Sequence, residues 1–155
     1  MLVDFNTLNE ESRIWIYGSE HKLTNKQEQY ILKSISDYLQ GWEAHKVSLT
    51  AGVTILENHF IIIALDESKN AASGCSIDTL QKKIQAIEKE LSVSLLNRLN
   101  VFCRINNKIQ CVPSFQLGRV VKSNILFYDL SIQRKSELHS YLKPISKGWC
   151  ARFLN

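Results

Sequence analysis

His59-Phe60-Ile61-Ile62-Ile63-Ala64-Leu65 contains an unbroken apolar run that is rich in branched side chains. A run of this kind, in which apolar and polar residues do not alternate, is typical of a strand that is covered on both faces. We therefore expect this strand to lie inside a sheet rather than at its edge. The polar residues 66–72 follow it and predict a loop.

A second strand is expected directly before this one, from Lys46 to Leu56. Glu57-Asn58 separates the two strands and is short enough to form a hairpin turn, which makes the pair antiparallel. With these two residues as the turn, Leu56 is opposite His59 and Val53 is opposite Ile62. The hairpin then carries apolar groups on both faces.

An amphipathic helix is expected after the loop, beginning within Ala72-Ser73-Gly74-Cys75-Ser76-Ile77-Asp78. Ser76 or Asp78 is the expected N-cap, because short polar side chains accept hydrogen bonds from the free amides of a first turn. Cys75 would then lie just outside that turn. Apolar residues at spacings of three and four predict the buried face of this helix: Ile77, Leu80, Ile84, Ile87 and Leu91.

The N-terminal part of the chain predicts a strand and then a helix. Residues 12–17 have the aromatic and branched side chains of a strand, which Gly18 ends. Thr24 or Asn25 begins a helix that ends near Gly41, and Trp42, directly after it, is expected to pack in the core. The apolar face of the helix is expected to consist of Tyr30, Ile31, Ile35, Tyr38 and Leu39.

A second hairpin is expected from residues 101–105 and 108–112, because Asn106-Asn107 suits the left-handed backbone of a tight turn. In this register Cys103 is opposite Gln110 and Cys111 is opposite Phe102. The two thiols therefore point to opposite faces, and neither a disulfide nor a shared metal is expected.

The rest of the chain predicts shorter elements. Residues 94–99 predict a helical turn, and Ser114 is expected to cap a short helix that reaches Val121. Residues 125–130 predict a strand, and a helix is expected from about Ser131 to Leu142, where Pro144 stops it. The tail from residue 148 carries large apolar side chains and is expected to dock on the body of the protein.

These elements predict the α+β fold class, with one domain over residues 1–155. The expected architecture is a mixed, mostly antiparallel sheet with two β-hairpins, packed by three or four helices. A 45% hydrophobic content is enough for a core, and the sequence contains neither repeats nor a linker.

The net charge of +4 is a mild bias, since acidic and basic residues are mixed along most of the chain. Dedicated nucleic-acid binding is not expected. We expect no membrane association and a cytoplasmic location, because neither a membrane span nor a signal peptide is recognisable. One basic cluster predicts at most a weak patch for an acidic partner: Arg134, Lys135, Lys143, Lys147 and Arg152.

Several kinds of chemistry are excluded because the sequence lacks the motifs that they require. The four cysteines lack CxxC pairing, which fits reduced thiols, and neither a structural metal nor a cofactor is expected. GxxxxGK[ST], GxGxxG and HExxH are absent, and the histidines are scattered. Gln81 occupies the arginine position of a CxxxxxR loop, so a cysteine phosphatase is excluded.

Cys75 is the residue on which the functional interpretation depends. The free amides and the positive dipole end of a helix start stabilise a nearby anion, including a thiolate. Gly74 permits a sharp turn and keeps the space beside the sulfur open, while Ser73 and Ser76 can donate hydrogen bonds to a bound anion. The alternative interpretation has no functional site: Gly74 only makes the turn, Ser76 only caps the helix, and Cys75 is a small buried hydrophobic residue.

Five other residues are predicted to assist the thiol. Asp66 and Asn70 are the nearest polar groups in sequence before it and can orient a ligand or assist proton transfer. Loop solubility and turn formation are the alternative roles for these two residues. His45 and Asp78 are further candidates for proton transfer, and Arg119 is expected to bind an anion if it turns towards the thiol.

Six parts of the sequence together carry a resemblance: Arg13-Ile14-Trp15-Ile16-Tyr17, Trp42-Glu43-Ala44-His45, Phe60-Ile61-Ile62-Ile63, Asp66-Glu67, residues 72–78, and Trp149 with Arg152-Phe153. On these residues the whole chain resembles a family of short uncharacterised proteins found mainly in Bacteroidetes-type bacteria, some of which are labelled ABC transporter ATPase. The resemblance implies a bacterial protein without an established activity. The missing P-loop lysine argues against the ATPase label.

Gly74-Cys75 is also similar to the Gly-Cys pair between sheet and helix in sulfur-acceptor and iron–sulfur scaffold proteins. The further cysteines and the acidic ligand of a scaffold have no counterparts in this sequence. This similarity therefore implies the receipt of a sulfur or acyl group on one thiol rather than cluster assembly.

Three functional hypotheses follow. The first is cysteine-dependent group transfer or hydrolysis at Cys75. The second is a noncatalytic binding module that uses residues 73–78 to hold a protein partner or a small anion. The third is a homo-oligomer formed through exposed aromatic residues near Trp42 or Trp149.

Overall fold

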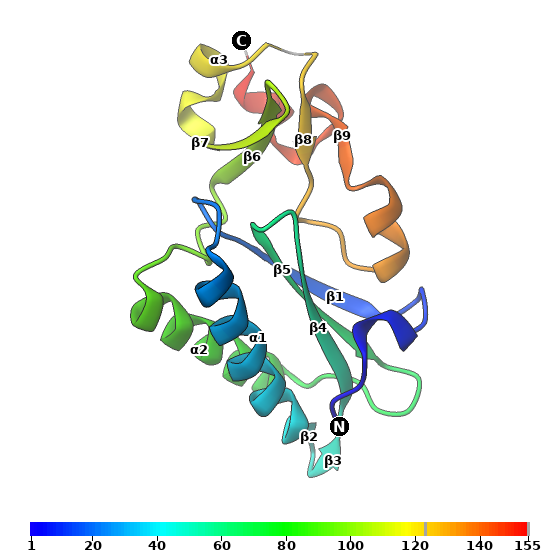
Figure 1. Ribbon diagram of the computed structural model, residues 1–155. Helices are drawn as coiled ribbons and strands as arrows, with labels where there is room; N and C mark the ends of the chain where they lie inside the picture. Colours follow the sequence, from blue (N-terminus) through cyan, green and yellow to red (C-terminus); the bar gives the residue numbers. More distant parts are fainter. Residues whose placement is uncertain (123, 155) are drawn as a thin grey trace. The chain divides into compact units, whose positions relative to one another are not determined.

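The computed structural model describes residues 1–122 and 124–154, and its contacts divide the chain into two compact units (Figure 1). Unit 1 consists of Met1–Leu96 and Gln133–Ser136, and unit 2 of Asn97–Ile132 and Glu137–Asn155. Helices and antiparallel sheets are both present, so the predicted α+β class is confirmed. The single domain over residues 1–155 stays a prediction.

The sheet of unit 1 has three antiparallel strands in the order β1-β5-β4. They are β1 (Arg13–Gly18), β4 (Thr50–Leu56) and β5 (Phe60–Asp66). β5 lies in the middle, and its first six residues are buried. The prediction of an internal strand is confirmed, because a central strand is covered on both faces.

The predicted register of the β4–β5 hairpin is wrong by one residue. Leu56 pairs with Phe60 rather than with His59, and Val53 pairs with Ile63. The reason is that His59 stays in the turn: its amide donates to Leu56 O (3.1 Å), and its carbonyl accepts from Ser19 N (2.8 Å). Glu57 and Asn58 both adopt positive φ, of 57° and 55°, as the tight turn requires.

Helices α1 (Asn25–Gln40) and α2 (Gly74–Leu91) pack on one face of this sheet (Figure 1). α1 begins with a capping box at Thr24 and ends at Gly41, as predicted. Tyr30 does not belong to its buried face, because this side chain is 42% exposed. Ile77, predicted for the buried face of α2, is only half-buried and is not one of the residues of this core. The other predicted apolar positions supply the core of unit 1, with these helical residues buried: Ile31, Ile35, Leu39, Leu80, Ile84 and Ile87.

The chain between α1 and β4 forms a small hairpin instead of a continuous strand. Its strands are β2 (Glu43–Ala44) and β3 (Val47–Ser48), joined by His45 and Lys46. These two turn residues have positive φ, of 52° and 64°. The strand predicted over residues 46–56 therefore begins later, at Thr50.

Both outer strands of the unit 1 sheet have further partners. Ala51 N of β4 donates to Met1 O (3.1 Å), in the segment before the 3-10 turn η1 (Phe5–Thr7). On the other side, Ile14 N of β1 donates to Gln133 O (3.0 Å). Met1 and Gln133 thus lie along the two edges of this sheet and limit its pairing with other chains.

Unit 2 contains a four-stranded antiparallel sheet in the order β7-β6-β8-β9. The strands are β6 (Asn100–Ile105), β7 (Lys108–Pro113), β8 (Leu126–Tyr128) and β9 (Leu142–Pro144). The β6–β7 hairpin turns at Asn106 and Asn107, with φ of 53° and 61°. Its register is as predicted, with Cys103 opposite Gln110 and Cys111 opposite Phe102.

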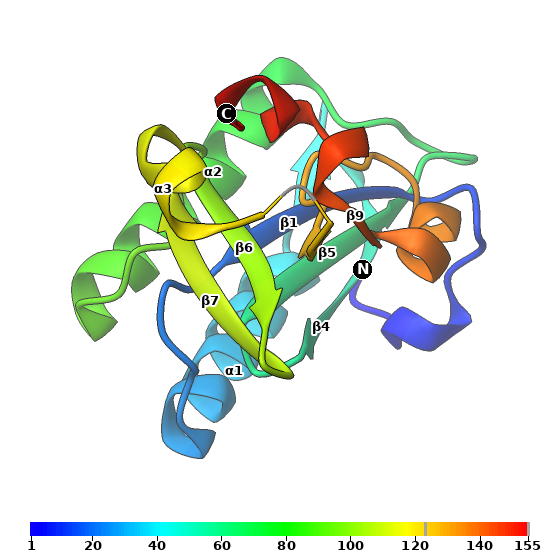
Figure 2. The ribbon, with the colours of Figure 1, turned by 90° about the horizontal axis from the view of Figure 1, so that it is seen from above.

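Short helical turns complete unit 2. Figure 2 shows β6 and β7 side by side, with α3 (Leu117–Val120) at the end of β7 after the 3-10 turn η2 (Ser114–Gln116). Ser114 does not cap a helix with its side chain, which corrects the prediction. The turns η4 (Ile145–Lys147) and η5 (Trp149–Phe153) dock the tail on the core of unit 2, as expected.

Two predicted helices do not form. Residues 94–99 are not helical, and the helix expected from Ser131 to Leu142 is replaced by the 3-10 turn η3 (Lys135–Ser140) and by β9. The chain is extended after residue 140 because Tyr141 O accepts from Asp129 N (2.8 Å), beside the β8–β9 pair. Pro144 thus ends a strand rather than a helix.

Candidate functional site

A surface pocket of about 750 Å³ lies in unit 1, where the first turn of α2 meets the end of α1 and the β2–β3 hairpin. The pocket combines aromatic, hydroxyl, thiol and imidazole side chains. It contains four of the residues predicted for the site, and a fifth, His45, comes from a distant part of the sequence. Its lining consists of Tyr38, Gly41, Trp42, Glu43, Ala44, His45, Ser73, Gly74, Cys75, Ser76 and Thr79.

The start of α2 differs from the prediction, because Ser73 is the N-cap rather than Ser76 or Asp78. Ser73 Oγ accepts from Ser76 N (3.0 Å), and Ser76 Oγ accepts from Ser73 N (2.8 Å). This reciprocal capping box places Cys75 inside the first helical turn. The two hydroxyls that were expected to hold a ligand therefore also hold the helix start together.

Gly74 is the first residue of α2, and its φ is not positive. It is therefore not required for a sharp turn, which corrects that part of the prediction. A side chain added at Gly74 would meet no atom within 4 Å. The space beside this residue is open, as expected.

A hydrogen-bond network joins residues that line the pocket. Trp42 Nε1 donates to Ser76 O (3.0 Å), and Thr79 Oγ1 donates to the same carbonyl oxygen (2.9 Å). Tyr38 OH and Thr79 Oγ1 are 2.8 Å apart. Burial raises the pKa of Tyr38. Trp42, which is 3% exposed, packs in the core as predicted and also fixes α1 and α2 to one another.

Cys75 is the exposed thiol of the chain, whereas the other cysteines are covered to different degrees. Burial raises the pKa of Cys103 to about 12 and that of Cys150 to about 11. Cys111 is half-buried. The interpretation of Cys75 as a small buried hydrophobe is therefore wrong, and its accessibility distinguishes it from the buried thiols of unit 2.

His45 shares the pocket with Cys75, as the functional hypothesis required. It lies in the β2–β3 turn and is exposed. Asn70 holds this turn in place, because its Nδ2 donates to Ala44 O (3.3 Å) and to Val47 O (3.0 Å). Asn70 itself does not line the pocket, so its contacts support a positioning role rather than a ligand contact.

Asp66, Asp78 and Arg119 are not among the residues that line the pocket. Asp66 Oδ1 accepts from Ser68 N (2.9 Å), and hydrogen bonds from the Ser68 backbone and side chain lower the pKa of Asp66. Asp78 pairs with Lys82 one turn along α2 (3.3 Å). Arg119 lies on α3 in unit 2.

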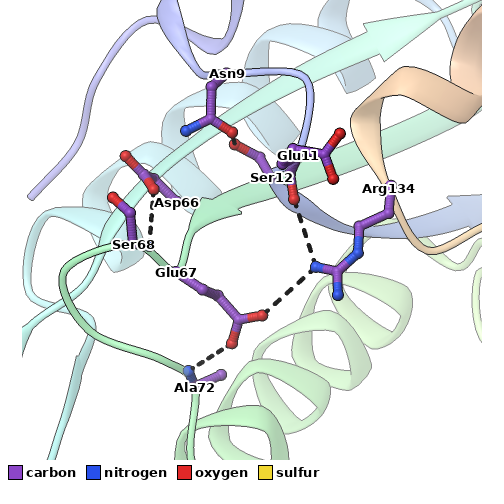
Figure 3. Close-up of polar contacts among 8 residues, drawn as sticks. All are labelled: Asn9, Glu11, Ser12, Asp66, Glu67, Ser68, Ala72 and Arg134. Atoms are coloured by element: carbon purple, nitrogen blue, oxygen red, sulfur yellow. Dashed lines mark hydrogen bonds and ion pairs between the residues drawn. The ribbon is translucent and has the colours of Figure 1, made fainter.

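A polar cluster at the loop before α2 was not predicted (Figure 3). Glu67 Oε2 accepts from Ala72 N (3.1 Å), and Glu67 Oε1 lies 3.8 Å from Arg134 Nη1. The same Arg134 nitrogen donates to Glu11 O (3.4 Å). These contacts join both ends of the loop that leads to α2. Glu67 was named from the sequence as part of the Asp66-Glu67 pair, and Arg134 as part of the basic cluster, but their contact was not predicted.

The aromatic residues named for the oligomer hypothesis are not free surface groups. Trp42 is buried, and Trp149 is half-buried and packs edge-to-face against Phe153 at 6.5 Å between ring centroids. The homo-oligomer hypothesis itself stays a prediction.

Comparison of the chain with protein-family models, curated proteins and solved structures found no match. The resemblance described above therefore stays a prediction. Within residues 1–122 and 124–154, no three His, Cys, Asp or Glu side chains are grouped so that they could hold a metal ion. No helix in the same part of the chain is both long and apolar enough to cross a membrane.

Proposed function

We propose that the pocket at the start of α2 binds a small electrophilic ligand and that Cys75 accepts a group from it. The observation that supports this proposal is the position of Cys75, an exposed cysteine in the first turn of an 18-residue helix, in the wall of a pocket that also contains His45. A nucleophilic cysteine requires access, a proton acceptor and stabilisation of negative charge. Each of these requirements has a structural counterpart here.

The chemical step follows from these groups. The Cys75 proton passes to the His45 imidazole, and Sγ forms a bond with the electrophilic carbon or sulfur of the ligand. The leaving group departs with the bonding electron pair and takes the proton from the imidazolium. The amides and dipole of the α2 start favour negative charge at the reacting centre.

The pocket lining also indicates the ligand class. Tyr38 supplies aromatic surface, and Glu43 supplies a carboxylate, whereas the lining described here includes neither lysine nor arginine. A ligand with several negative charges would lack a cationic partner. We therefore infer an uncharged or singly charged ligand, whose anionic group, if it has one, binds backbone amides.

A noncatalytic binding module is the alternative, and one observation favours it. Asp66, Asn70 and Asp78 contact other protein groups and do not line the pocket, which leaves His45 as the predicted helper within it. In that case the pocket holds its ligand without forming a covalent bond, and the cysteine is one of several contacts.

An acyl-transfer assay separates the two functions. The intact protein is incubated with phenyl thioacetate at neutral pH, and peptide mass spectrometry locates any added acetyl group. We expect acetylation of Cys75, its loss in Cys75→Ser, and no change in Cys111→Ser. Wild-type protein that stays unmodified, or that is modified equally at Cys111, would contradict a nucleophilic role for Cys75.

His45→Asn tests the proton acceptor without disturbing the turn, because asparagine tolerates the positive φ of 52° at this position. We expect acetylation of Cys75 to slow by about 100-fold, the usual size of a general-base contribution. An unchanged rate would remove His45 from the mechanism while leaving Cys75 in place.

A further inference from the structure

The charges of the protein are distributed very unequally between the two units. Unit 2 has eight basic residues and two acidic ones, whereas unit 1 has eleven basic and thirteen acidic residues. Acidic and basic residues are thus mixed in unit 1, whereas unit 2 is predominantly basic. The prediction that the protein does not bind nucleic acid was based on mixed charges along most of the chain, and unit 2 departs from that pattern. The basic residues of unit 2 are Arg98, Arg104, Lys108, Arg119, Lys122, Lys143, Lys147 and Arg152.

Eight basic and two acidic residues give unit 2 a formal charge of +6. Asp129 is 7% exposed and pairs with Lys143 at 2.8 Å, so these two charges neutralise each other. The other acidic residue, Glu137, lies on η3. The large excess of positive charge over the surface of unit 2 favours an anionic partner.

Four of the basic residues belong to one part of unit 2, which we call the basic cap and define as residues 114–122 and 145–153. These two segments contain no aspartate or glutamate. Their turns η2 and η5 pack against each other, and Figure 1 draws both at the upper end of unit 2. The four basic side chains of the basic cap are exposed: Arg119, Lys122, Lys147 and Arg152.

The basic cap also presents aromatic surface. Phe115 is 75% exposed, the highest value among the large hydrophobic side chains of residues 1–122 and 124–154, and it precedes Arg119 by four residues. The Arg152 guanidinium lies over the Phe153 ring, 4.9 Å from its centroid. The Phe115 ring is therefore accessible to a partner.

We propose that the basic cap binds single-stranded nucleic acid, with Phe115 stacked on a base and the four basic side chains along the phosphates. Exposed aromatic rings beside arginine and lysine, without acidic residues, match the chemistry of such strands. An acidic protein segment would satisfy the cations but has no particular use for an aromatic face. This site is separate from the pocket of unit 1 and does not depend on its chemistry.

The first experiment measures the binding of a fluorescent oligouridylate to the full-length protein at several salt concentrations. With up to four phosphate contacts, the slope of log Kobs against log salt is expected to be about −3, since single strands give about −0.7 per contact. Arg119→Gln/Lys122→Gln is expected to reduce the slope to about −1.4. The matched control Lys82→Gln/Lys89→Gln, which removes two exposed charges of α2, is expected to leave the slope unchanged.

The second experiment tests stacking at Phe115. Phe115→Leu keeps an apolar side chain and is expected to weaken binding about tenfold, whereas Phe115→Trp retains it. Circular dichroism confirms that the variants are folded. No binding at low salt, or equal losses with the α2 control pair, would overturn the proposal. Polyglutamate that competes as well as the oligouridylate, with no effect of Phe115→Leu, would assign the basic cap to an acidic protein instead.

Discussion

At the scale of single residues, the fold depends most on positions where there is no space for a larger side chain. A Cβ placed on Gly148 would lie 2.1 Å from Cζ and 2.4 Å from Cε1 of the Phe127 ring. Phe127 is completely buried and lies in the core of unit 2, which also contains Ile145 and Cys150. Only glycine allows the tail to pass this close to the ring.

Gly148→Ala is therefore expected to lower the free energy of unfolding by about 2 kcal/mol, because the ring must move within a packed core. Urea unfolding followed by tryptophan fluorescence measures this change. Gly41→Ala is the control, since a Cβ at that position meets no atom within 4 Å. Equal stability of Gly148→Ala and the wild type would show that the tail does not pack on Phe127.

Asp129 makes a pH-dependent contribution to stability. Burial opposes its charge, but hydrogen bonds from Lys143 and Ser131 outweigh this effect, and the pKa of Asp129 is lowered in the folded protein. A lowered folded-state pKa means a contribution that is present above the unfolded value, near 3.9, and is lost as the pH falls through the folded value.

Asp129→Asn is expected to cost about 2 kcal/mol at pH 7, because the charged partner Lys143 stays partly buried without a counter-charge. The difference from the wild type is expected to shrink below about pH 4. Urea unfolding at a series of pH values measures it. Asp37→Asn on α1, where the aspartate and Lys33 are both largely exposed, serves as the control with little expected effect.

At the scale of elements, β5, α1 and most of the apolar face of α2 could be predicted from local patterns, which are an unbroken apolar run for β5 and spacings of three and four for the helices. The β4–β5 register was not predictable, since it depends on the bond from Ser19 N to His59 O, a contact between distant residues. For the same reason the pairing of β9 with β8 overrides the helical pattern after Ser131.

The candidate site was predictable only in part. Cys75 and His45 could be named from the residues. Their shared pocket depends on the β2–β3 hairpin, which was not predicted: β3 was expected to belong to a longer strand that began at Lys46, and β2 was assigned to no element. The hydrogen bonds of Asp66 and Asn70 could not be predicted, because neither a side-chain bond within a loop nor one to a distant hairpin leaves a periodic pattern in the sequence.

The capping box of α2 links the stability of this element to the site. Ser73→Ala removes the acceptor for Ser76 N and is expected to cost about 1 kcal/mol, as loss of a cap usually does. Thr24→Ala, the matched change at the cap of α1, is expected to cost a similar amount. Thermal unfolding measures both.

The two cap variants are expected to differ in thiol reactivity. Ser73→Ala should slow alkylation of Cys75 by iodoacetamide, because the first turn of α2 frays, whereas Thr24→Ala should not. Equal alkylation rates in the two variants would mean that the helix start does not control the thiol.

At the scale of the whole molecule, unit 1 is completed by four residues that come late in the chain. Lys135 Nζ donates to Phe5 O (3.1 Å) and to Leu8 O (2.6 Å), and it lies 5.1 Å from the centroid of the Phe5 ring. The segment 133–136 thus fixes the N-terminal turn η1 as well as the edge of β1. Contacts between residues so far apart were not predictable from local patterns.

Lys135→Met keeps most of the apolar length of the side chain but removes both hydrogen bonds. We expect a loss of about 2 kcal/mol in the free energy of unfolding, measured by urea denaturation. Lys122→Met, at an exposed position of unit 2, is expected to change stability by less than about 0.5 kcal/mol. A Lys135 variant as stable as this control would contradict a structural role for the segment 133–136.

The reactivity of Cys75 in the folded protein tests the functional proposal most directly. The protein is treated with iodoacetamide at pH 7, once folded and once in urea, and peptide mass spectrometry gives the rate for each cysteine. We predict that Cys75 reacts several-fold faster in the folded chain, since it is exposed there and shares its pocket with His45, the proposed proton acceptor, while Cys103 and Cys150 are buried and protected. A rate for Cys75 that is equal or slower in the folded protein would contradict the account.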